Sequence, residues 1–349
     1  MSAPTRRRRR VTIREIAEQA GVSTGAVSYA LNDKPGISDT TRERILTIAE
    51  ELGWYPNHAA RSLSASRAGA CGLVIARPAR TLALEPFFME FIAGVESELS
   101  SSSTALTIQL VESVANEVEV YRRWSGEHRV DGVLVVDLRS DDPRIEELAL
   151  SGLPAVIVGG PIEGGAIPSV WHDEASSVAE VVRYLGALGH VHIARVAGVA
   201  GFAHTGWRTK AFDRTVQELA LTSVVMSTDY SPESGARATR QLLSDPNPPT
   251  AIVYDSDVLA VTGLGVAQQM GFSVPDDVSI VAWDDSMLCQ VVNPPLTAMA
   301  RDITAYGAAA SRRLLAEIES PGLGDVETPR AELTTRGSTS RVRAAAARR

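Results

Sequence analysis

Cysteine is scarce in this sequence of 349 residues, which contains only Cys71 and Cys289, far apart along the chain. A disulfide framework and a CxxC metal pair are therefore excluded, and this cysteine usage suits a reducing cytosol. Long apolar runs are also missing, since none approaches the ~18 residues that a membrane span requires. The sequence predicts a soluble, cytoplasmic protein without a membrane partner.

Signals for secretion and for catalysis are missing as well. Arg6 to Arg10 form a basic start, but the segment that follows, VTIREIAEQAG, is interrupted by charges and has no apolar run. The nucleophile motif GxSxG and the phosphate loop GxxxxGK[ST] do not occur. We therefore expect no export, no catalytic residues, no cofactor and no metal site.

Charge is distributed unevenly along the chain. Residues 1–67 carry 11 Lys plus Arg against 7 Asp plus Glu, a net charge of +4, whereas the remainder carries a net charge of −12. A positive patch on an acidic protein indicates a polyanionic partner that is bound by one end only. The run from Arg6 to Arg10 could equally be a solvated, disordered tail, and its role stays open.

Two short segments of helical periodicity flank a glycine in the stretch VTIREIAEQAGVSTGAVSYALN, which begins at Val11. Thr12 can cap the first helix together with Glu15, and Ser23 can cap the second. Gly21 readily takes the left-handed conformation of a tight turn. The pattern predicts a helix-turn-helix.

A third helix is expected from about Thr40 to Leu52, after a loop that contains Pro35 and Gly36. Its apolar residues lie on one face and would close a three-helix core. From the pattern alone, a generic small helical bundle is an open alternative.

The residues that carry a family resemblance begin in this region. The strings AEQAGVSTGAVSYALN, ISDTTRERILTIAEELGWYPN and HAARSL closely resemble the lactose-repressor (LacI/GalR) family of bacterial regulators. The resemblance continues with EPFFMEFIAGVE, VDGVLVV, LGALGHVHIARVAG, YDSDVLAVTGLGVAQQMGFSVPDDVSIVAWDDS and PPLTAMARD, and so covers nearly the whole chain after the arginine run. It implies a transcriptional repressor that binds a palindromic, double-stranded operator and responds to a small molecule.

The resemblance places the second helix in the major groove of DNA. Its implied base readers are Thr24, Gly25 and Tyr29, and since Gly25 has no side chain, direct reading rests on the other two. Tyr29 could contact a thymine methyl group, donate through its hydroxyl, or be a partly exposed packing residue. Phosphate contacts are expected from Thr12, Ser23 and Ser28.

Residues 57–68 resemble the hinge of the family. A helix of this length is marginal alone in water, so we expect it to fold only on DNA. In the family two such helices pair in the minor groove, where Leu63 would wedge into the central base step. The neighbouring contacts would be Asn57, Ala60 and Arg61. Leu63 could otherwise be an apolar linker residue.

From Cys71 onward, short β-branched runs alternate with amphipathic helices, which predicts doubly wound α/β structure. One series runs from GLVIA to PAVIVGG and a second from HIARVAG to VSIVAW, so two similar lobes are expected. Small ligands bind at the carboxyl ends of such strands, and the cleft between two lobes is the natural site. The resemblance names this the periplasmic-binding-protein-like fold.

The expected fold class is an N-terminal all-α helix-turn-helix domain plus an α/β, periplasmic-binding-protein-like two-lobed domain. The predicted segments are a basic tail (1–10), the helix-turn-helix domain (11–56), the hinge (57–68), the effector-binding and dimerisation domain (69–342) and a second tail (343–349). The lobes are predicted at about 69–172 with 298–329, and at about 173–297 with 330–342.

The resemblance also implies a set of effector-binding residues: Phe87, Phe88, His204, Arg208, Tyr230, Ser256, Asp257 and Asp284. Their chemistry fits a sugar, because carboxylates accept hydrogen bonds from hydroxyls, a guanidinium donates to oxygens, and aromatic rings cover the apolar faces of a pyranose. Phe88 could instead be a core residue, and Asp257 could instead cap the following helix. His204 is expected to be a polar lining residue.

Several alternatives stay open at this stage. A purine-like or other non-sugar effector is one, although the excess of aspartate over basic residues argues against a multiply charged anion. An extracytoplasmic sugar receptor could share the two lobes, but it would have no reason to carry residues 11–63. We expect a homodimer, because the end of the chain, TSRVRAAAARR, lacks the leucine heptads of a tetramer-forming coiled coil. Whether the effector releases or promotes DNA binding is left open, with release favoured.

Overall fold

The computed structural model describes residues 11–54, 67–162 and 165–342. The chain divides into two units, Met1–Arg67 and Ala68–Arg349, and each is described here by itself. The predicted hinge helix lies outside the described residues, as does the Arg6 to Arg10 run. The same applies to the hinge contacts predicted at Asn57, Ala60, Arg61 and Leu63.

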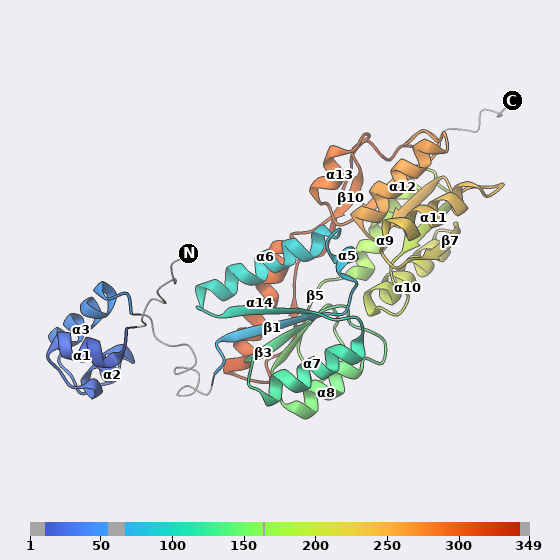
Figure 1. Ribbon diagram of the computed structural model, residues 1–349. Helices are drawn as coiled ribbons and strands as arrows, with labels where there is room; N and C mark the ends of the chain where they lie inside the picture. The colour runs from blue at the N-terminus through green and yellow to red at the C-terminus, as the bar shows by residue number, and fades with distance from the viewer. Residues whose placement is uncertain (1–10, 55–66, 163–164, 343–349) are drawn as a thin grey trace, which may run out of the picture. The chain divides into compact units, whose positions relative to one another are not determined.

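The first unit is a bundle of three helices (Figure 1), namely α1 (Ile13–Ala20), α2 (Thr24–Leu31) and α3 (Asp39–Glu51). Its core brings one face of each helix together through the fully buried side chains of Ile16, Val27 and Ile45. The third helix begins one residue before the predicted start.

Short-range capping sets the ends of these helices. A capping box opens α1, with the Thr12 side chain accepting from the amide of Glu15 and the Glu15 carboxylate accepting from the amide of Thr12. Gly21 ends α1 in the left-handed region at a φ of 61°. The Ser23 hydroxyl accepts from the amide of Ala26 at 3.2 Å and opens α2. The helix-turn-helix prediction is confirmed down to its caps.

The second unit contains two six-stranded sheets, each forming the centre of one lobe. The first sheet is parallel and has the order β11-β5-β4-β3-β1-β2. Its strands are β1 (Ala70–Ile75), β2 (Ala105–Leu110), β3 (Gly132–Val135), β4 (Ala155–Val158), β5 (Ser169–Trp171) and β11 (Val326–Glu327).

The second sheet has the order β12-β10-β9-β8-β6-β7, and only its edge strand β12 runs antiparallel to its neighbour. Its strands are β6 (His192–Ala197), β7 (Thr222–Ser227), β8 (Ala251–Tyr254), β9 (Ser279–Trp283), β10 (Thr297–Ala300) and β12 (Glu332–Thr334). The inner strands of both sheets are buried and mostly apolar because helices cover both faces, and the buried Arg195 on β6 is a charged exception.

Helices lie on both sides of each sheet, which gives each lobe three layers (Figure 1). The first lobe carries α5 (Ala79–Leu82), α6 (Pro86–Ser101), α7 (Val114–Gly126), α8 (Pro143–Ser151) and α14 (Ile303–Glu319). The second lobe carries α9 (Glu174–Ala187), α10 (Ala203–Glu218), α11 (Pro232–Leu243), α12 (Asp257–Gln269) and α13 (Met287–Val291). Among the described helices, none combines the length and the apolar character needed to cross a bilayer.

The chain passes between the two lobes three times, after β5, after β10 and after β11. The second passage corrects the predicted lobe boundary at about residue 298. Thr297–Ala300 forms β10, which pairs with β9 and β12 of the second sheet, so the return to the first lobe begins at Arg301. All three passages are short segments at the carboxyl ends of strands, the edge at which ligands bind to such sheets.

Candidate functional site

Two separate groups of predicted residues can be located, one on α2 and one in the two-lobed unit. On α2, Thr24 and Gly25 are exposed and Tyr29 keeps 45% of its surface exposed. The Tyr29 ring also lies against Gly36, where an added Cβ would be 3.3 Å from two ring carbons. Tyr29 therefore packs on one side and offers its other side to a partner.

The hydroxyl groups predicted to contact phosphates already have local roles. Thr12 and Ser23 cap α1 and α2 as described above. The Asn32 side-chain amide donates to the backbone carbonyl of Ser28 at 2.8 Å and lies 3.5 Å from the Ser28 hydroxyl, at the end of α2. These contacts hold α2 in shape, and each hydroxyl oxygen keeps a second lone pair that can accept another hydrogen bond.

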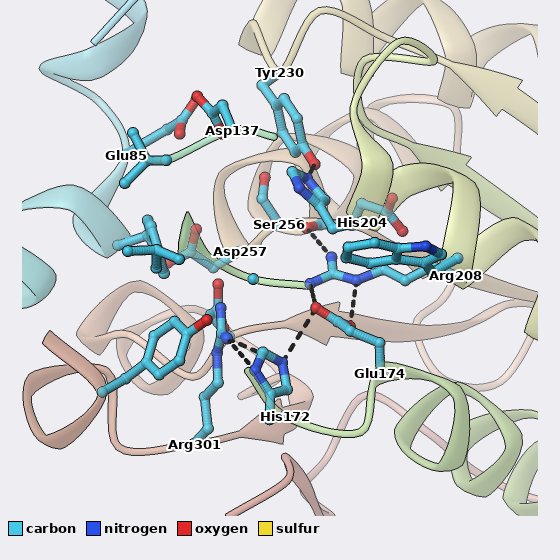
Figure 2. A pocket seen from close by; sticks show the side chains of 18 of the residues that line it. Glu85, Asp137, His172, Glu174, His204, Arg208, Tyr230, Ser256, Asp257 and Arg301 are labelled. Atoms are coloured by element: carbon cyan, nitrogen blue, oxygen red, sulfur yellow. Dashed lines mark hydrogen bonds and ion pairs between the residues drawn. The ribbon is translucent and has the colours of Figure 1, made fainter. Parts of the chain in front are cut away.

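A cavity of about 100 Å³ lies between the two lobes, at the carboxyl ends of the strands (Figure 2). Seven of the eight predicted effector-binding residues line it, namely Phe87, His204, Arg208, Tyr230, Ser256, Asp257 and Asp284. They come from α6, α10 and α12 and from the ends of β7 and β9. The structure thus gathers residues that are up to about 200 positions apart in the sequence.

Phe88 is the exception, and its prediction as a lining residue is wrong. Its side chain is 1% exposed and belongs to the core of the first lobe. Helical phase explains the difference, because Phe88, Phe91 and Val95 share the inward face of α6 whereas Phe87 is rotated toward the cavity.

Ser256, rather than Asp257, is the N-cap of α12, since its hydroxyl accepts from the amide of Leu259 at 3.2 Å. Asp257 therefore occupies the first helical position and lines the cavity. Burial raises the pKa of Asp257 to about 6, and the nearby charge of Asp284 adds to this effect against a hydrogen bond from Ser286. This carboxyl group accepts a hydrogen bond from a hydroxyl when ionised and can donate one when protonated.

The sequence did not predict most of the charged residues that line the cavity: Arg77, Glu85, Asp137, His172, Glu174, Asp255 and Arg301. With the predicted residues, the lining holds six carboxylates and three guanidinium groups. Asp255 directly follows β8, and Asp137 lies two residues after the end of β3. This position, just after a buried apolar strand, is the signal in the sequence that could have identified the two residues. Five of the six carboxylates accept a hydrogen bond from an arginine side chain, and Asp257 is the one without such a partner among the described residues.

One ionic cluster joins the two lobes near α6. The guanidinium of Arg77 donates to Asp137 at 2.6 and 2.8 Å and to both oxygens of Glu85 at 2.7 Å. Its Cζ also lies 5.0 Å from the ring centre of Phe202 and 4.9 Å from that of Tyr230, which belong to the second lobe. Burial raises the pKa of Glu85 to about 7 in spite of the charge of Arg77.

A second ionic chain crosses the passages between the lobes (Figure 2). Arg208 donates to the two oxygens of Glu174 at 2.7 and 2.9 Å, and His172 Nε2 lies 3.1 Å from the same carboxylate. Arg301 Nη1 lies 3.0 Å from His172 Nε2, and its Nε donates to Asp284 at 3.0 Å. His172 lies in the first crossing segment and Arg301 in the second. This series of ionic contacts therefore links the cavity wall to two of the three passages.

Neighbouring charges keep the Glu174 carboxylate ionised. Burial raises the pKa of Glu174, but the charges of Arg208 and His172 outweigh it and hold the pKa well below its usual range. Arg208 is also stacked 4.2 Å from the ring centre of Trp283. Its predicted role as a free donor fork is therefore modified, because Glu174 occupies two of its donors.

His204 is a neutral lining residue in this environment. Burial, and then the charge of Arg208, lower the pKa of His204 to about 4. Its Nε2 lies 3.0 Å from the hydroxyl of Tyr230, with which it shares a hydrogen bond. The geometry fits the predicted polar role.

Backbone conformation is unusual at three of the lining residues. Asp137, Tyr230 and Asp284 have φ values of 51°, 65° and 65° although none is glycine. Each follows a strand of the central sheets. Such conformations persist where surrounding contacts dictate them, and they cluster at functional sites.

Comparisons with known proteins agree with this architecture. A family model described as "Bacterial regulatory proteins, lacI family" matches residues 12–57, and one described as "Periplasmic binding protein-like domain" matches residues 182–339. The HTH-type transcriptional regulator AglR of Rhizobium meliloti (strain 1021) is 32% identical over 339 residues, which cover 94% of this chain and 94% of that protein.

This chain belongs to the lacI family of bacterial regulatory proteins. A solved complex of the transcriptional regulator CelR with cellobiose is similar to it, with a TM-score of 0.72, 27% identity and coverage of 94% of this chain and all of that one. The lac repressor dimer bound to operator and the anti-inducer ONPF has the same fold, with a TM-score of 0.85, 24% identity and coverage of 95% of this chain and all of that one. This lacI-family protein is a DNA-binding transcriptional regulator, with a helix-turn-helix unit and a two-lobed periplasmic-binding-protein-like unit.

Proposed function

We propose that this regulator represses carbohydrate-utilisation genes and that a small sugar releases it from its operator. The observation that carries the proposal is that seven of the eight residues implied by the family resemblance line one cavity between the lobes. Asp257 and Asp284 offer hydrogen-bond acceptors to hydroxyls, and the Phe87 ring can cover the apolar face of a pyranose. The many carboxylates disfavour a multiply charged anion.

On the DNA side, Thr24 and Tyr29 on the exposed face of α2 are proposed to read base edges in the major groove. Leu63, with Asn57, Ala60 and Arg61, is proposed to bend the operator from the minor groove. A homodimer would present two such units to the two halves of a palindrome.

The two activities are coupled through the lobes. A sugar that binds between them favours one relative orientation, and the three crossing segments are where the orientation changes. If that orientation is the one with low operator affinity, the operator also weakens sugar binding by the same factor.

The test is binding of the full-length protein to a fluorescent fragment of its own upstream region, at fixed salt, with and without a panel of sugars. We expect tight binding that one sugar weakens by at least about tenfold, which corresponds to a coupling of about 1.4 kcal/mol. Asp284→Asn should abolish the response to sugar and retain DNA binding. Tight binding that only a nucleobase or another non-sugar compound alters would overturn the sugar assignment and retain the regulator.

A further inference from the structure

An aromatic ring of the second lobe contacts two arginine side chains of the first lobe. Phe202 lies at the start of α10, and its ring centre is 5.0 Å from the Cζ atoms of both Arg77 and Arg139. The backbones of Arg139 and Phe202 also form an isolated antiparallel β-bridge. A guanidinium is attracted by the electrons of an aromatic face, and the attraction is stronger where water is excluded, as at the buried Phe202. The two lobes are therefore in direct contact through these three residues.

A backbone hydrogen bond accompanies the ring contacts. The amide of Ala203 donates to the carbonyl of Leu138 at 2.7 Å, again from the second lobe to the first. Because Ala203 is the first residue of α10, its amide has no acceptor within its own helix. The side chains of Ala203 and Leu138 belong to the same buried apolar cluster. We call Arg77, Leu138, Arg139, Phe202 and Ala203 the interlobe clasp.

The interlobe clasp lies across the cavity from the segments that connect the lobes. Arg77 donates to Glu85 and Asp137. Figure 2 shows these two carboxylates on the opposite side of the cavity from His172 and Arg301, which lie on two of the crossing segments. Lobes that part by rotation about the crossing segments must therefore break the clasp.

Opening of the interlobe clasp leaves the charges within each lobe paired as before. Arg77 keeps Glu85 and Asp137, which belong to its own lobe, so no buried ion pair is divided. The buried Nε of Arg139 has no hydrogen-bond partner among the described residues, and water reaches it once the lobes part. Opening removes only ring contacts and one hydrogen bond, each of which changes an equilibrium about twofold to thirtyfold. Contacts of this strength favour one arrangement and still permit the other.

We propose that the interlobe clasp favours closed lobes in the ligand-free protein and thereby sets the effector concentration at which the regulator responds. Phe202 and Arg139 are positioning residues in this device, because neither lines the cavity. A weaker clasp raises the population of parted lobes, so a ligand that binds between closed lobes must supply more of the free energy of closing. The closed resting arrangement does not depend on the chemical class of the effector, whereas the effect on DNA rests on the proposed function.

Hydrogen exchange of the full-length, ligand-free protein measures opening of the clasp. The Ala203 amide is protected by a carbonyl of the other lobe, so its exchange rate follows the population of parted lobes. Arg139→Met keeps an apolar stem but removes the guanidinium, and it should accelerate exchange at Ala203 at least about threefold. Exchange in β6 and β8, two inner strands of the second sheet, should change less than about twofold. An unaltered rate at Ala203 would overturn the proposal, as would equal acceleration in these strands.

Two further variants are controls for Arg139→Met. Arg139→Lys keeps a cation beside the ring and should recover most of the protection of Ala203. Arg129→Met removes an exposed arginine of the first lobe that takes no part in the clasp, and it should leave the Ala203 rate unchanged. Equal acceleration by Arg129→Met and Arg139→Met would assign the effect to the charge of the lobe instead of the ring contact, against the proposal.

Phe202→Leu tests whether the ring and the guanidinium act through one contact. If they do, adding Arg139→Met to Phe202→Leu should change the Ala203 rate less than about twofold further. Phe212→Leu is the matched control for loss of a buried ring on α10, because Phe212 belongs to the core of the second lobe and not to the clasp. It should accelerate exchange in β6 at least as much as at Ala203. Independent effects of Phe202→Leu and Arg139→Met would contradict the clasp.

Operator binding links the interlobe clasp to regulation. Under the proposed function, closed lobes have low operator affinity, so Arg139→Met should tighten binding of the full-length protein to its upstream fragment about twofold to fivefold without sugar. A variant that is merely damaged would not bind DNA more tightly. Accelerated exchange at Ala203 with unchanged operator affinity would overturn the link to regulation, together with the coupling in the proposed function, and retain the closed resting arrangement. Unaltered exchange with a normal sugar response would overturn the clasp and leave the proposed function standing.

Discussion

The helix-turn-helix unit and the cavity are built in opposite ways from the same chain. In the helix-turn-helix unit, the contacts that set the helix ends join residues three to five positions apart, as in the capping box of Thr12 and Glu15, and the core contacts span fewer than 35 positions. In the cavity, Arg77 meets Asp137 across 60 positions, and Arg301 meets His172 across 129. The first region is therefore specified locally, whereas the second exists only once two sheets have formed.

This difference predicts how the two regions respond to substitution. Loss of a local contact should destabilise the helix-turn-helix unit alone. Loss of one cavity charge should destabilise the lobe that contains it, because its ionic partner then stays buried without a counter-charge. The following substitutions compare the two regions, beginning with the largest expected effect.

Glu174→Ala should have the largest effect, because it leaves the buried guanidinium of Arg208 without its carboxylate. Removing one partner of a buried ion pair costs about 3–5 kcal/mol. Urea unfolding followed by tryptophan fluorescence measures this loss in the two-lobed unit, since four of the five tryptophans lie there. Glu174→Gln keeps an acceptor and should lose less, and exchange protection of α1 to α3 should not change. A loss below about 1 kcal/mol would show that water replaces the carboxylate.

Asp257 supplies a pH test of the cavity. Its pKa is raised to about 6 in the folded protein, so between about pH 4 and 6 the folded chain keeps a proton that the unfolded chain has released. The free energy of unfolding should therefore fall as the pH rises through this window, relative to Asp257→Asn, by about 2–3 kcal/mol. Urea unfolding at pH 4 and pH 7 gives the difference. A pH-independent difference would contradict the raised pKa.

The sequence predicted the local region almost completely, because caps, glycine and helical spacing are all visible within a few residues. It also placed most strands and helices of the two lobes, and the error at residue 298 came from extending the first lobe into β10. Seven of the eight effector-site predictions line the cavity. Phe88 failed because one position on a helix changes the direction of a side chain by about 100°.

The sequence did not predict which charged residues of the cavity lining pair with one another. Arg77, Glu174 and Arg301 occupy ordinary positions near the ends of strands and helices. The residues next to them in the sequence do not indicate which charged residue each one pairs with. Their pairing depends on which strand ends are adjacent in each sheet and on how the lobes approach each other.

Thr24→Ala tests the other side of the comparison. Loss of a side chain that reads a base edge costs about 1–3 kcal/mol, which would weaken operator binding roughly fivefold to a hundredfold or more. Fluorescence anisotropy with the upstream fragment measures this change, and calorimetry should find unaltered sugar affinity. Equal binding of the variant to specific and scrambled DNA would place Thr24 at a base. A uniform loss on both fragments would assign it to the backbone instead.

Ser23→Ala should have the smallest effect and the most local one. It removes the hydroxyl that accepts from the Ala26 amide, and the loss of such an N-cap costs about 1 kcal/mol. Hydrogen exchange of the full-length protein should therefore accelerate about fivefold in α1 to α3 and stay unchanged in both sheets. Ser23→Asp restores an acceptor and should restore protection, yet it places a negative charge beside the proposed phosphate contact and should weaken operator binding. Restored protection with weakened binding would separate the capping role of Ser23 from its role at DNA, whereas changed exchange in the sheets would contradict the local specification of this unit.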